Sequence, residues 1–149
     1  MSDTVDIWPS RYLALAKQIA SWSKDPSTKV GCVIIDELGR PVSFGYNGFP
    51  RGTCDHYTDR DTKLSQTIHA EMNAVLAAGR HINGCVVYVT HPPCIPCLCH
   101  LKQSFVTKIV CLDGGEEFAK RWSTDTVIAK AKEFGIDLII YDESILSHD

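Results

Sequence analysis

Residues 68–105, IHAEMNAVLAAGRHINGCVVYVTHPPCIPCLCHLKQSF, decide the fold of this chain. Helix-forming residues fill 68–80, and the β-branched and aromatic run 85–90 predicts a strand. A pair of prolines ends that strand, and a second helix is expected over about 94–105, because proline is well tolerated in a first helical turn. A helix, a strand and a helix in close succession are typical of an α/β fold.

The flanking segments continue this pattern on both sides. Before it, apolar residues at three- and four-residue steps predict a helix over 10–22, and two β-rich runs, 30–35 and 42–46, predict a hairpin. Residues 47–66 hold Gly, Pro, Asp and Thr without periodicity, which predicts a loop long enough to carry function. The elements expected after it are a strand over 108–112, a loop over 113–117, a helix over 124–134 and a strand over 136–141.

This order of elements predicts a three-layer α/β/α architecture, in which a five-stranded mixed sheet carries helices on both faces. The chain has 149 residues, 44% of them hydrophobic, which suits one domain with a sizeable core. We therefore expect a single domain over residues 1–149 with one functional site.

Charge and composition exclude several classes of partner. The formal net charge is -3, and the 15 basic and 18 acidic residues are interspersed, so the chain lacks the basic face that binds long nucleic acids. A small phosphorylated substrate needs only one or two local cations and remains compatible. No signal peptide is recognisable and no apolar run approaches the ~20 residues that span a bilayer, so we expect a cytoplasmic protein with no membrane partner. In a reducing compartment, the seven cysteines indicate metal ligands and buried thiols.

Two short motifs at the expected starts of the two helices carry the chemistry. His69 and Glu71 form a His-Ala-Glu motif, and Cys94 and Cys97 stand three residues apart, so both sulfurs can face one point. One imidazole and two thiolates suit zinc, and three protein ligands leave the fourth tetrahedral position open, as in a catalytic site. Zinc would lower the pKa of its water toward roughly 7, and Glu71 would move the proton. This combination is the signature of zinc-dependent nucleobase deaminases.

Two other interpretations of these residues remain open. A structural zinc site favours four protein ligands, and Cys99, His91 or His100 could supply the fourth. A redox C-x-x-C pair would account for the cysteines but for neither His69 nor Glu71. We expect Cys99 itself to be a packed thiol.

Beyond these motifs, the chain resembles the deoxycytidylate deaminase family, part of the cytidine deaminase superfamily. The resemblance covers most of residues 10–141. It rests on the zinc motifs and on three segments: 22–31 (WSKDPSTKVG), 45–52 (GYNGFPRG) and 69–74 (HAEMNA). It implies a cytidine deaminase-like fold and an enzyme that hydrolyses dCMP to dUMP and ammonia.

The resemblance also implies roles for individual residues and partners. Zinc would be held by His69, Cys94 and Cys97, and Glu71 would be the catalytic proton carrier. The implied substrate contacts are Asn47, Ala70, Thr28 and Lys29, and the implied effector contacts are Gly45, Tyr46, Gly48 and Arg80. The implied partners are dCMP as substrate, dCTP with Mg²⁺ as activator, dTTP as inhibitor and further copies of the chain in a homo-oligomer, often a hexamer.

Residues 113–122, DGGEEFAKRW, depart from the Asp/Lys/Tyr-containing stretch that the family tends to show. The candidates for binding the phosphate are therefore basic residues judged by charge alone: Lys29, Arg51, Lys120 and Arg121. Trp122 could stack on a pyrimidine, although we expect a capping or core role. His91 and Pro92 also depart from the family pattern and could reshape the wall near the leaving group.

Some alternatives stay open at this point. Cys54 and His56, in the long loop, could help to hold a second metal. Arg80 could equally be a simple surface residue. The activity could be that of a nucleoside, free-base or tRNA-adenosine deaminase on the same scaffold, or the chain could be a non-catalytic zinc- or nucleotide-binding module.

Overall fold

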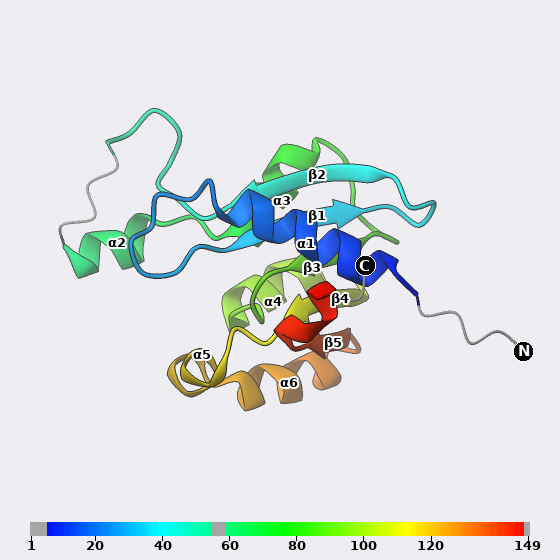
Figure 1. Ribbon diagram of the computed structural model, residues 1–149. Coiled ribbons are helices and arrows are strands. Elements are labelled where there is room, and N and C mark those ends of the chain that lie inside the picture. Colours follow the sequence, from blue (N-terminus) through cyan, green and yellow to red (C-terminus); the bar gives the residue numbers. More distant parts are fainter. Residues whose placement is uncertain (1–5, 55–58, 148–149) are drawn as a thin grey trace, which may run out of the picture.

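A computed structural model describes residues 6–54 and 59–147 and shows a sheet between two layers of helices (Figure 1). Its strands are β1 (Gly31–Ile35), β2 (Pro41–Tyr46), β3 (Val86–Val89), β4 (Lys108–Leu112) and β5 (Asp137–Tyr141). Its helices are α1 (Trp8–Ala20), α2 (Arg60–Gln66), α3 (Ala70–Ala78), α4 (Ile95–Gln103), α5 (Glu116–Trp122) and α6 (Thr124–Glu133), with a 3₁₀ helix, η1 (Glu143–Ser147).

The five strands form one mixed sheet in the order β2-β1-β3-β4-β5. β1 pairs antiparallel with both β2 and β3, whereas β3, β4 and β5 run parallel to one another. The predicted three-layer fold with a five-stranded mixed sheet is therefore confirmed.

The sheet separates two hydrophobic cores. Side chains alternate between the faces of a strand, so in β1 Cys32 and Ile34 pack with residues of α3, α4 and α6, while Val33 and Ile35 pack with α1 and η1. All five residues of β1 are buried, as expected of a central strand that is covered on both faces. α3 and α4 therefore share one layer, and their first turns are brought to the same region.

A glycine in β2 fixes how closely α3 approaches the sheet. A Cβ atom at Gly45 would lie 2.5 Å from the backbone N of Ala74 and 2.6 Å from the backbone O of Ala70. Real Cβ atoms do not approach backbone atoms this closely, so only glycine fits here without moving the helix. The position of the first turn of α3 thus depends on Gly45.

The structure corrects two sequence-based predictions. The segment 47–66, expected to be a loop, contains helix α2. The structure also has an additional helix, α5, which begins within the expected loop over 113–117 and ends before the expected helix over 124–134. Both helices have seven residues and bury none of them, so neither has the apolar period by which a helix is recognised in a sequence. At α2 the local signal is Asp59, whose side chain accepts a hydrogen bond from the Asp61 N–H at 3.1 Å.

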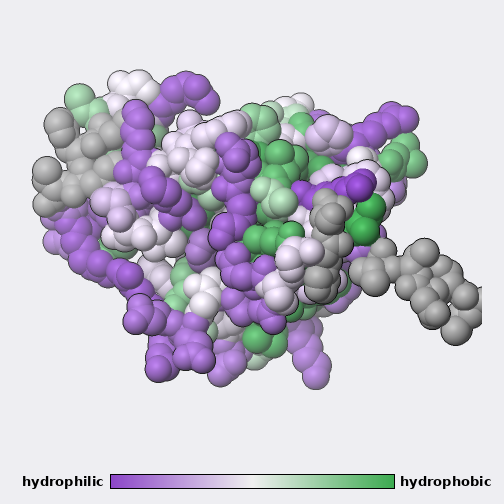
Figure 2. Space-filling model, in the orientation of Figure 1, coloured by the Kyte–Doolittle hydropathy of each residue, from purple (hydrophilic) through white to green (hydrophobic). Residues whose placement is uncertain are grey.

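Hydrophilic residues cover the surface around α2 and α5, as Figure 2 shows for this face of the molecule. Within residues 6–54 and 59–147, no helix combines the length and apolar character needed to cross a membrane.

Candidate active site

Three side chains from α3 and α4 converge on one point. His69 and Cys94 are the N-cap residues of α3 and α4, and Cys97 lies in the first turn of α4. The Nδ1 atom of His69 lies 3.3 Å from the Sγ atom of Cys94 and 3.2 Å from that of Cys97. Among the described residues, this is the one group of three His, Cys, Asp or Glu side chains whose ligand atoms all lie within 4.8 Å of one another.

The spacing of these atoms fits a zinc ion. Tetrahedral zinc, with Zn–N of about 2.0 Å and Zn–S of about 2.3 Å, separates its N and S ligands by about 3.6 Å, a few tenths more than the distances here. Hydrogen bonds with Cys97 and His69 lower the pKa of Cys94, which favours its thiolate. A bound metal would deprotonate coordinating thiols outright. His69, Cys94 and Cys97 would therefore hold zinc.

The candidates for a fourth protein ligand point elsewhere. The ring Nδ1 of His91 lies 2.8 Å from Thr90 Oγ1, and that of His100 lies 2.7 Å from the carbonyl oxygen of Pro96. Cys99 is exposed, so the expectation of a packed thiol was wrong. The described residues thus offer three ligands and leave one tetrahedral position for solvent or substrate, the pattern of a catalytic site.

Glu71 lies in the first turn of α3, next to the cluster, and is only 4% exposed. Burial, together with the nearby Cys94 thiolate, raises the pKa of Glu71 to about 7, although a hydrogen bond with its own backbone and the charge of His69 act in the opposite direction. A carboxyl group whose pKa lies near neutrality can both accept and donate a proton at physiological pH.

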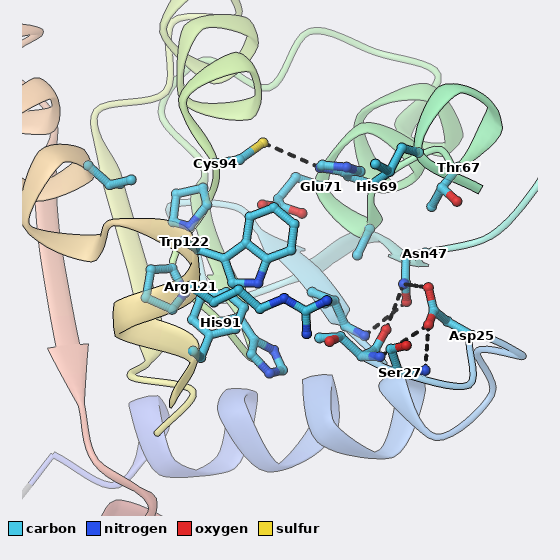
Figure 3. A pocket seen from close by; sticks show the side chains of 18 of the residues that line it. Asp25, Ser27, Asn47, Thr67, His69, Glu71, His91, Cys94, Arg121 and Trp122 are labelled. Carbon is cyan, nitrogen blue, oxygen red and sulfur yellow. Dashed lines mark hydrogen bonds between the residues drawn. The ribbon is translucent and has the colours of Figure 1, made fainter. Parts of the chain in front are cut away.

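The cluster stands at one side of a cavity of about 130 Å³ (Figure 3). His69, Glu71 and Cys94 line this zinc side. The rest of the wall, called the opposite side below, includes the turn after α1 and residues of α2 and α5. The site is therefore a hollow in which a small molecule can meet the metal ligands.

Residues 6–113 match the family model described as the cytidine and deoxycytidylate deaminase zinc-binding region. The matched part covers well over half of the chain and includes the three clustered ligands and Glu71. The chain belongs to this deaminase family. Zinc binding is a property of the matched region, and the His69, Cys94 and Cys97 cluster is where this family member can hold the ion.

Individual relatives support the assignment to the family. A deaminase of Aliivibrio fischeri described as uncharacterized is 43% identical over 117 residues, which cover 77% of this chain and 79% of that protein. Human deoxycytidylate deaminase is 32% identical over 112 residues, which cover 69% of this chain and 63%, less than two thirds, of the human protein. The crystal structure of a dCMP deaminase from cyanophage S-TIM5 in complex with dCMP and dUMP has a TM-score of 0.75 at 22% identity, with 93% of this chain and 99% of that one covered. That structural similarity confirms the fold.

The expected substrate contacts of this deaminase-family chain fall into two groups. Asn47, Ala70 and Thr28 line the cavity. Lys29 does not, because its ammonium group donates to the carbonyl oxygen of Ser23. Lys29 is thus not part of the cavity lining, and its expected contact with the substrate stays a prediction.

None of the four expected effector residues lines the zinc cavity. Gly45, Tyr46 and Gly48 line a second, open cavity of about 620 Å³ beside β2, together with Arg51. Arg80 lines neither of the two cavities and donates from Nε to the carbonyl oxygen of His81 at 2.8 Å. The structure thus groups three of these four residues and separates Arg80 from them.

Of the four basic residues proposed from charge for the phosphate, one lines the zinc cavity, namely Arg121 of α5. Trp122 also lines it and is 41% exposed. Of the expected capping or core role, the core role was therefore wrong, and the capping role stays a prediction. The sequence reasoning missed Arg60 and Lys63, which line the cavity from α2. A recognised N-cap at Asp59 could have revealed this helix.

The remaining expectations concern the wall residues His91 and Pro92 and a second metal site. His91 and Pro92 line the cavity, as expected of residues in its wall. Cys54 is exposed, and its suggested partner in a second metal site, His56, lies outside the described residues.

Proposed function

We propose that this chain catalyses the hydrolytic deamination of dCMP to dUMP and ammonia. One observation carries the proposal: a cluster of three zinc-compatible ligands reaches a small cavity through His69 and Cys94, and the buried carboxyl group of Glu71 lines the same cavity. A closed structural site or a redox pair would require neither Glu71 nor an adjoining cavity. The names of the relatives, deoxycytidylate deaminase among them, support the choice of substrate.

His69, Cys94 and Cys97 would hold the zinc ion, which when bound supplies a water acidic enough to act as a nucleophile near neutral pH. Glu71 accepts the proton of the attacking water and donates it to the ring nitrogen of the cytosine. It then takes the remaining proton from the hydroxyl group added to the ring carbon and passes it to the exocyclic amine. The C–N bond breaks, ammonia leaves and the carbon becomes the carbonyl of dUMP. The raised pKa of Glu71 suits this two-way transfer.

The nucleoside part of the substrate would lie against Asn47, Ala70 and Thr28, which line the cavity. Backbone N–H groups at the first turns of α3 and α4 would bind the base and its hydrated form, because such groups have no partner within their helix. The 5′-phosphate would lie between Arg60 of α2 and Arg121 of α5, two guanidinium groups suited to a phosphate.

Regulation and assembly are proposed on the family resemblance. dCTP with Mg²⁺ would activate and dTTP would inhibit the enzyme by binding near Gly45, Tyr46 and Gly48, within a homo-oligomer such as a hexamer. The second cavity beside β2 offers space for such a nucleotide. Light scattering would give the oligomeric state, and rates measured with each triphosphate would test the regulation.

The decisive experiment measures ammonia release by the zinc-loaded protein from dCMP, deoxycytidine, guanine and a tRNA substrate. We expect dCMP to have the highest kcat/KM. Equal activity on deoxycytidine would contradict recognition of the phosphate, and activity on guanine or tRNA alone would contradict the proposed substrate. Absence of all turnover would favour a non-catalytic zinc protein.

A further inference from the structure

Outside the zinc cluster, the cavity wall contains a second buried acid, Asp25, which is 4% exposed. Its Oδ1 atom accepts hydrogen bonds from the backbone N–H of Ser27 at 2.8 Å and of Thr28 at 3.1 Å. Despite its burial, which acts in the opposite direction, hydrogen bonds from Lys63, Ser27 and Thr28 keep the pKa of Asp25 below its usual value. Asp25 is thus an ionised group built into the wall.

Asp25 is joined to the amide of Asn47, a proposed substrate contact. Asn47 Nδ2 lies 3.4 Å from Asp25 Oδ2 and donates to the Thr28 carbonyl oxygen at 2.9 Å. Asn47 Oδ1 accepts the Val30 N–H at 2.9 Å. Both ends of the amide are therefore held, and Figure 3 shows Asn47 and Asp25 bonded side by side at the cavity.

The counter-ion of Asp25 comes from a helix that has few other means of attachment. Lys63 Nζ lies 3.0 Å from Asp25 Oδ1, and the two side chains are 19% and 5% exposed. Lys63 belongs to α2, which buries none of its residues. A largely buried ion pair that also receives hydrogen bonds is costly to break on one side, because the remaining charge stays buried.

We propose that Lys63 is a positioning residue: its ion pair with Asp25 ties α2 to the Ser27–Val30 wall and holds the Asn47 amide in its binding orientation. The inference rests on the proposed function for its kinetic consequences. Its structural consequence, the ordering of the 25–30 turn by Lys63, does not depend on which substrate is used.

The distinction from direct phosphate binding is sharp. If Lys63 bound the phosphate, its substitution would raise KM for dCMP and leave KM for deoxycytidine unchanged. A lysine that orders Asn47 acts on the nucleoside part, which the two compounds share. Substitution of Lys63 should therefore raise KM for both compounds by the same factor.

The experiment compares Lys63→Gln, which removes the charge and keeps a polar chain, with Lys63→Arg, which keeps the charge. Lys132→Gln on the exposed part of α6 is the matched control. With Lys63→Gln we expect KM for dCMP and for deoxycytidine to rise about 10-fold, with kcat within about twofold, as for a misplaced binding group. Lys63→Arg should recover most of the loss, and Lys132→Gln should match the parent.

Hydrogen exchange gives a readout that needs no turnover. The amides of Thr28 and Val30, which donate to Asp25 and Asn47, should exchange about 10-fold faster in Lys63→Gln than in the parent or in Lys132→Gln. Unchanged KM and unchanged exchange would overturn the proposal, and so would a rise in KM confined to dCMP. A parent protein without activity on either compound would refute the proposed function, while the exchange comparison would still decide the role of Lys63.

Discussion

The two sides of the cavity are built differently. The zinc side stands on α3 and α4, whose first turns adjoin the main hydrophobic core: Ala70 and Leu98 are fully buried. The opposite side stands on α2 and α5, neither of which buries a residue. Chemistry at a metal needs ligands held to fractions of an ångström, which a packed core provides. Recognition of a polar substrate can be placed on surface helices that polar contacts hold in position.

Charge separates the two sides as well. The zinc side has two thiols and the buried carboxyl group of Glu71, whereas the opposite side presents Arg60, Lys63 and Arg121 against the single carboxylate of Asp25. Substitutions should accordingly divide into those that remove chemistry, those that displace the scaffold and those that weaken recognition.

The largest effect should come from Glu71→Gln, which removes the proposed proton carrier from the zinc side and keeps the shape of its side chain. We expect kcat for dCMP to fall by about 10²–10⁴-fold, the usual contribution of a positioned acid or base. Zinc content by mass spectrometry and the unfolding midpoint should remain close to those of the parent. Normal turnover by this variant would show that the assigned mechanism is wrong.

The packing of α3 against the sheet, which places the zinc side, can be disturbed by a substitution at Gly45. Gly45→Ala would drive a Cβ atom into the backbone of α3, and we expect a loss of about 1–3 kcal/mol in the free energy of unfolding. Zinc affinity should fall with it, because α3 carries His69. Gly48→Ala is the control, since a Cβ atom there meets nothing within 4 Å. Equal denaturation midpoints for the two variants would contradict the close contact.

Recognition should respond more selectively. We expect Arg121→Gln to lower kcat/KM for dCMP by about 10-fold, corresponding to a lost charge-assisted hydrogen bond. The rate on deoxycytidine should change little by comparison. Lys120→Gln, the neighbouring exposed cation that does not line the cavity, is the control. A similar loss with both variants would indicate a general effect of charge instead of a phosphate contact.

The smallest effect is a pH dependence of stability due to His91, which lines the cavity wall. Burial lowers the pKa of His91 to about 4, below the value of about 6.5 expected in the unfolded chain. As pH falls below 6.5 the unfolded chain takes up a proton first, so the stability due to neutral His91 is present above pH 6.5 and is lost toward pH 4. We expect a loss of about 1–2 kcal/mol between pH 6.5 and 5. The free energy of unfolding of His91→Gln, measured by denaturation across this range, should lack this loss. The same pH dependence in the parent and the variant would contradict the role of His91.

The zinc side was predictable because its signals are local. A His-x-Glu motif and a Cys-x-x-Cys pair at the starts of two helices identify the ligands and Glu71 without any tertiary contact. The strands and long helices were predictable for the same reason, since β1 and α1 carry clear apolar patterns. The opposite side was not, because α2 and α5 have no buried face to leave a period in the sequence.

By itself the sequence determined the sheet, its two helical layers and the donor set for a metal, because spacing along one helix or strand fixes which side chains share a face. Only the tertiary structure decided which charges meet the cavity. Arg121 lines it and Lys120 does not, and Lys63 reaches Asp25 from a helix far along the chain. Such pairings depend on how separate elements are arranged in space, and no local spacing encodes that arrangement.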